Sequence, residues 1–97
     1  MNMNMIMQQA QKMQKDIKKA QDEIENKTFT VKKELVEIEM KGDKKLQKIN
    51  IDKNIDSEDV EVLEDMILLA INDAITQIDS EMEEKLGKFG KGIPGLF

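Results

Sequence analysis

Lysine is the residue type through which this chain would bind a negatively charged partner. All fifteen basic residues of the 97-residue sequence are Lys, and the sequence has no Arg, His or Cys. An ammonium group binds phosphate as a point charge, whereas the bidentate reading of guanine depends on the planar fork of Arg. The lysines are therefore candidate contacts to a polyanion, and we expect little readout of base sequence.

The missing residue types exclude several classes of site. Without Cys or His there are no disulfides, no usual zinc sites, and no Cys–His or Ser–His nucleophile pairs. Only Ser57 and Ser80 offer serine hydroxyls, so an active site would be built from carboxylates and Lys alone. We expect a protein that is not an enzyme, with no cofactor, no metal and no small-molecule substrate.

Charge is distributed unevenly along the chain. The formal net charge is −5, but residues 1–53 carry +3, residues 54–86 carry −10 and residues 87–97 carry +2. Such asymmetry can indicate a polyanion-binding end and an acidic end, although charge alone favours the simpler alternative. The alternative is that each helix merely has a solvated polar face.

An amphipathic helix is expected over residues 3–25, about 35 Å long. Its apolar residues recur in three unbroken heptads: Met3, Ile6, Ala10, Met13, Ile17, Ala20 and Ile24. Asn26 suits the end of this helix. Lys12, Lys15, Lys18 and Lys19 lie opposite the apolar seam, along about 10 Å of one face. No stretch of the chain approaches the roughly 18 apolar residues of a membrane span, and the apolar residues 1–7 are too short and lack the basic start of a signal peptide.

Three strands are expected next, over residues 28–32, 34–41 and 46–52, because apolar and polar residues alternate there. One long bent strand across 32–34 is the alternative for the first two. Gly42 can supply a positive φ in the second connection. The pattern predicts an antiparallel sheet with one wet face.

A second helix is expected over residues 57–86, capped by Asp56 or Ser57 and ended by Gly87. Residues 66–71 place apolar side chains on nearly every face of this helix, which indicates that other parts of the protein pack against more than one of its faces. Residues 1–87 therefore form one α+β domain, and the Gly- and Lys-containing segment 88–97 is its tail.

The first helix is nearly twice as long as the expected sheet, so its own sheet leaves part of its seam uncovered. A second copy of the chain is the simplest cover. The expected dimer interface comprises Ile6, Ala10, Met13, Ile17, Ala20, Ile67, Ala70, Ile71 and Ala74. The alternative is that the first helix packs only on the second helix of its own chain.

Three stretches of sequence resemble the YbaB/EbfC family of bacterial nucleoid-associated proteins. They are Gln-Gln-Ala-Gln-Lys-Met-Gln at 8–14, Val-Leu-Glu-Asp-Met-Ile at 62–67 with Ala-Ile-Asn-Asp-Ala at 70–74, and Glu-Lys-Leu-Gly-Lys at 84–88 with Ile-Pro-Gly-Leu at 93–96. The resemblance covers nearly the whole chain. It implies an α-β-β-β-α subunit with two long protruding helices, a tight homodimer, binding to double-stranded DNA with an effect on its conformation, and a place in the nucleoid of the bacterial cytoplasm.

The candidate DNA contacts are lysines in four groups. They are Lys12, Lys15, Lys18 and Lys19 of the first helix, Lys32 and Lys33, Lys44, Lys45 and Lys48, and Lys88 and Lys91 of the tail. Asp16, Asp22 and Glu23 lie near the first group and can pair with it. Asp73, within the apolar stretch of the second helix, is expected to be structural and can anchor a Lys of a partner.

The leading hypothesis is therefore a homodimeric DNA-binding protein that contacts mainly backbone phosphates. The alternative is a dimeric adaptor that engages another protein through the acidic second helix or the apolar tail, with little or no DNA binding.

Overall fold

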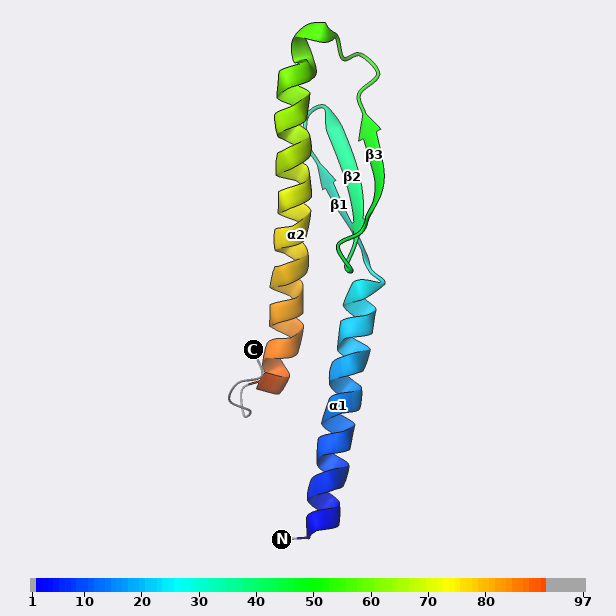
Figure 1. Cartoon of the computed structure of the whole chain (residues 1–97), viewed down its shortest axis with the longest axis vertical. Helices are drawn as coiled ribbons and strands as arrows, with labels where there is room; N and C mark the ends of the chain where they lie inside the picture. Colours follow the sequence, from blue (N-terminus) through cyan, green and yellow to red (C-terminus); the bar gives the residue numbers. More distant parts are fainter. Residues whose placement is uncertain (1, 91–97) are drawn as a thin grey trace.

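The computed structural model describes residues 2–90, which form an elongated molecule with principal extents of 70 × 21 × 13 Å. Along the chain lie α1 (Met3–Glu25), β1 (Thr28–Lys32), β2 (Val36–Lys41), β3 (Leu46–Ile51), a 3₁₀ turn (Ser57–Asp59) and α2 (Val60–Gly90). Figure 1 shows α2 running beside the sheet and α1 extending beyond it. The expected α+β order and the protruding helix are confirmed.

Local signals placed most element ends correctly. The side chain of Asn2 accepts a hydrogen bond from the Asn4 amide at the start of α1, and Asn26 caps its end. Asp56 accepts from the Glu58 amide at 3.2 Å, while Asp59 accepts from the Asp56 amide at 3.3 Å. This reciprocal cap satisfies amides that have no partner inside the helix.

The sheet is antiparallel with strand order β1-β2-β3, and a turn separates β1 from β2, so they are two strands. Opposite residues include the pairs Val31↔Ile38 and Ile38↔Ile49, which fix the register. α2 packs on β1 and β2. The alternate residues of these two strands that face α2 are buried, whereas every residue of β3 is exposed.

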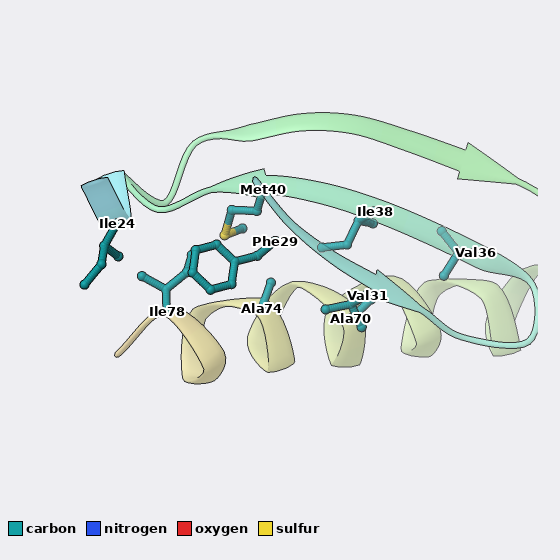
Figure 2. Close-up of a cluster of buried hydrophobic side chains, with 9 residues drawn as sticks. All are labelled: Ile24, Phe29, Val31, Val36, Ile38, Met40, Ala70, Ala74 and Ile78. Carbon is teal, nitrogen blue, oxygen red and sulfur yellow. The ribbon is translucent and has the colours of Figure 1, made fainter. Parts of the chain in front are cut away.

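The core lies between α2 and the first two strands (Figure 2). Ile38, Ala70 and Ala74 have no exposed surface there, and Ile24 adds the end of α1 to the same cluster. The small alanines allow α2 to approach the sheet closely. Ile24 is the one residue of α1 that is buried.

Both expectations about glycine were wrong. The residue with positive φ in the β2–β3 connection is Lys44, at 67°, and Gly42 is not in the left-handed region. Gly87 does not end α2, because the helix continues to Gly90 with Leu86 buried and Phe89 half-buried. The apolar period of the helix outweighs the cost of one glycine. Residues 88–90 of the expected tail are thus helical, and residues 91–97 lie outside the described part.

We expect Gly87→Ala to raise the free energy of unfolding by about 0.5–1 kcal/mol, the usual gain from removing a helical glycine. A Cβ built at Gly87 meets no atom within 4 Å. Urea unfolding followed by circular dichroism measures the change. A lower midpoint than that of the parent protein would contradict the placement of Gly87 inside α2.

Candidate nucleic-acid interface

The candidate interface is the lysine face of α1, which we define as Lys12, Lys15, Lys18 and Lys19. All four side chains are exposed. At about 100° per residue, Lys15 and Lys19 lie nearly half a turn around the helix from the seam that leads to buried Ile24. Lys12 and Lys18 lie about a third of a turn from the seam, on opposite sides of it. The fold therefore turns the apolar side of α1 toward α2 and the ammonium groups toward solvent.

α1 carries as many acids as lysines, but within the described residues one acid forms an ion pair with the lysine face. Lys18 Nζ lies 3.6 Å from Asp22 Oδ2, but these side chains are 77% and 51% exposed, so water screens the pair. Within residues 2–90, Lys12, Lys15 and Lys19 form no ion pair. These three ammonium groups are free to meet an anion.

The acidic start of α2 lies far from the lysine face. The 3₁₀ turn Ser57–Asp59 and the first turn of α2, with Glu58, Asp59 and Glu61, occupy the end of the molecule opposite the N-terminus of α1 (Figure 1). The acids at positions 58–61 are thus separated in space from the lysine face, and salt largely screens them from it. The other half of α2 approaches α1 and carries further acids, namely Asp79, Glu81, Glu83 and Glu84.

Two other candidate lysines are engaged within the chain. Lys33 Nζ lies 2.5 Å from Asp73 Oδ2, and Lys44 Nζ lies 2.8 Å from Asp79 Oδ1. Asp73 thus holds a lysine of its own chain. Both pairs join a strand connection to α2, so contact of these lysines with phosphate would compete with an internal ion pair.

The lysines of the sheet face a mixed surface. Lys32 lies directly across from Glu37, and Lys48 directly across from Glu39, on the side of the sheet away from α2. Lys45 is exposed in the β2–β3 connection, and Lys88 is exposed in the last turn of α2. Lys91 lies outside the described residues. The structure therefore does not gather the eleven candidate lysines into one surface.

Sequence reasoning missed Gln8 and Gln11, which stand one helical turn before Lys12 and Lys15. With Lys18 and Gln14 they line one shallow open surface of α1. Amide groups donate hydrogen bonds to phosphate oxygens. The same helical spacing that located the lysines also locates these glutamines.

The expected dimer residues separate into three groups. Ala70 and Ala74 have no exposed surface, so they are core residues of one chain and offer nothing to a partner. Met13, Ile17, Ala20, Ile67 and Ile71 are half-buried. Ile6 and Ala10 are exposed, as expected for a helix longer than the sheet beside it.

A second apolar surface was not expected from the sequence. Leu46, Ile49 and Ile51 of β3 are 39–44% exposed. Their partners in β2 are Met40, Ile38 and Val36, which are core residues, so the β3 side chains share the side of the sheet that α2 covers elsewhere. Leu68 and Leu69 of α2 are also exposed, at 60% and 57%.

Other kinds of site receive no support from the described residues. Within residues 2–90 no three His, Cys, Asp or Glu side chains gather as metal ligands. The same part of the chain contains no helix that is long and apolar enough to cross a membrane.

Comparison with known proteins gives a consistent result. The model of the YbaB/EbfC DNA-binding family matches residues 1–93. A nucleoid-associated protein of Lactococcus lactis subsp. cremoris (strain MG1363) is 50% identical, covering 97% of this chain and 98% of the relative. A nucleoid-associated protein of Ligilactobacillus salivarius (strain UCC118) is 41% identical, covering 99% and 95%. The length of the match and the level of identity place the chain in the YbaB/EbfC DNA-binding family.

Proposed function

We propose that this protein is a homodimer that binds double-stranded DNA through its backbone phosphates, changes the conformation of the duplex, and acts in the nucleoid of the bacterial cytoplasm without catalysing a reaction. The single observation that carries this proposal is the exposed and largely unpaired lysine face of α1. The family and the name of its relatives, nucleoid-associated protein, support the same partner and place.

Electrostatics favours the phosphate backbone as the target. Duplex DNA carries one negative charge per about 1.7 Å of axis, so a face about 10 Å long meets several phosphates. Each lysine that approaches a phosphate releases condensed counterions, which drives binding at low salt. The ammonium group of lysine is a point charge on a flexible side chain, and it can bind a phosphate next to any base. We therefore expect weak sequence preference.

The uncovered side of β3 supports the homodimer. α2 packs on β1 and β2, and Leu46, Ile49 and Ile51 remain partly exposed on the same side of the sheet. An apolar strip of this kind is a liability in an isolated chain. A second copy related by two-fold symmetry would bring its own exposed Leu68 and Leu69, so each chain offers both halves of an apolar contact.

A dimer also explains an effect on DNA conformation. Two lysine faces held by one dimer bind best to a duplex whose path meets both of them. Bending a site of 20–30 base pairs costs on the order of 1–6 kcal/mol, which added phosphate contacts can offset. Through this effect the protein would influence nucleoid organisation and gene expression.

We expect replacement of Lys12, Lys15, Lys18 and Lys19 by Gln to weaken DNA binding at least tenfold at low salt. The slope of log K against log salt should also become less negative, by about 0.9 for each phosphate that the variant no longer neutralises. Titration of a fluorescent duplex at several salt concentrations measures both quantities.

The matched control replaces Lys32, Lys45, Lys48 and Lys53 by Gln, which removes the same charge from the sheet and the loop that follows it. We expect this control to retain most of its affinity. If the control alone lost DNA binding, the DNA interface would have to be assigned to the sheet instead of α1. Absence of DNA binding by the parent protein even at low salt would favour the adaptor hypothesis instead.

We expect Ile49→Asp combined with Ile51→Asp to convert the dimer into single chains, because charge would enter the apolar strip of β3. Sedimentation at micromolar concentration measures the mass. Asn50→Asp with Lys48→Asp adds carboxylates to the other side of the same strand and should remain dimeric. A parent protein that sediments as a single chain would refute the dimer.

A further inference from the structure

The direction of α1 depends on a small junction at its C-terminal end. Of the 23 residues of α1, Ile24 is buried, and the N-terminal third of the helix is exposed. In Figure 2 the side chain of Ile24 lies with those of Phe29, Met40 and Ile78 at one end of the core. The lysine face begins about 7 Å from Ile24 and ends about 18 Å from it, measured along the helix axis.

Gly42, in the β2–β3 connection, lies directly against this end of α1. Its amide donates a hydrogen bond to the Lys27 carbonyl at 2.9 Å. A Cβ at position 42 would stand 1.8 Å from the Ile24 carbonyl oxygen, 2.5 Å from the Ile24 carbonyl carbon and 3.0 Å from Glu25 Cα. The backbone of Gly42 is not in the left-handed region, so the absent side chain is needed for space alone.

Ion pairs join the same junction to α2. Lys27 Nζ donates to Glu81 Oε1 at 2.6 Å and stands 5.1 Å from the centre of the Phe29 ring. Lys85 Nζ lies 3.8 Å from Glu23 Oε2 in α1. α1 also packs half-buried Met13, Ile17 and Ala20 toward α2, and these ion pairs together with Gly42 hold the end of α1 that is nearest the sheet.

We infer that Gly42 and the Lys27–Glu81 pair are positioning residues for DNA binding: they set the direction of α1 and so the place where its lysine face meets the duplex. This inference rests on the proposed function. Neither Gly42 nor Glu81 belongs to the candidate DNA contacts, so both act through the geometry of α1.

The close approach at Gly42 gives the size of the expected movement. An alanine Cβ needs about 3.4 Å from the Ile24 oxygen instead of 1.8 Å, so the end of α1 and the β2–β3 connection must separate by about 1.6 Å. The neighbouring atoms are backbone, and they cannot rotate away as a side chain can. A tilt at the junction displaces Lys12 more than Lys19, because Lys12 lies farther from Ile24 along the helix axis.

The direction of α1 can be measured directly because the chain has no Cys. Spin labels at Gln8→Cys on α1 and Thr30→Cys on the sheet, both exposed sites, report the distance between helix and body. Dilution with unlabelled chains removes distances between copies. The measurement is made without DNA, in parent protein, Gly42→Ala, Lys27→Met and the matched control Gly87→Ala.

We expect Gly42→Ala to shift the distance distribution by about 2 Å or more and to weaken DNA binding about fivefold, as if one or two phosphates were no longer reached. Lys27→Met should broaden the distribution and weaken binding in the same direction. Gly87→Ala should change neither, because its Cβ meets no atom. Circular dichroism and sedimentation should remain as in the parent protein.

An unchanged distribution in both junction variants would overturn the inference, and so would a shifted distribution with unchanged DNA affinity. If Gly42→Ala fails to fold, Lys27→Met alone decides between these outcomes. Failure of the proposed function is recognised separately, because the lysine-to-glutamine variant of α1 would then bind DNA as the parent does, whatever the label distances show.

Discussion

The unequal cover of the sheet by α2 is the constraint on which the other features depend. α2 packs on β1 and β2, and one continuous cluster from Ile24 to Ile78 makes the core. β3 and most of α1 lie outside that core. One chain therefore buries enough apolar surface to fix its fold and leaves two apolar strips exposed. It also places the lysine face of α1 apart from the acidic start of α2.

The same arrangement divides the lysines by role. Lys27, Lys33 and Lys44 lie where the strand connections approach α2, and each bonds to an acid of that helix. Lys12, Lys15 and Lys19 lie on the side of α1 away from its apolar seam, where no acid of residues 2–90 pairs with them. The negative net charge of the chain is thus compatible with DNA binding, because three acids of α2 bond to lysines of the body while three lysines of α1 face solvent without an ion pair within residues 2–90.

Sequence patterns predicted the elements well because their signals are local. The heptad steps located α1 to the residue, and Asp56 was recognised as a cap of the helix that follows it. Contacts between distant residues were not predictable in this way. The pairing of Lys33 with Asp73 joins residues 40 positions apart, and the need for glycine at position 42 arises only where Ile24 meets it. The exposure of Ile49 and Ile51 likewise depends on how far α2 reaches across the sheet.

Gly42 and Gly87 show the difference between what a local sequence signal predicts and what distant contacts decide. A glycine in a sequence indicates freedom of the backbone, but the structure uses Gly42 for close approach and carries Gly87 inside a helix at a small energetic cost. The surroundings of each position decide which meaning applies. Lysines make one face of α1 cationic, and the junction of α1 with the sheet and α2 sets the direction of that face.

Acetylation of lysines with and without bound duplex, read residue by residue by mass spectrometry, tests the central claim most directly. We expect DNA to protect Lys12, Lys15 and Lys19 and to leave the reactivity of Lys32, Lys45 and Lys48 nearly unchanged. Protection of the sheet lysines, with α1 as reactive as in the free protein, would contradict the assignment of the DNA interface to α1.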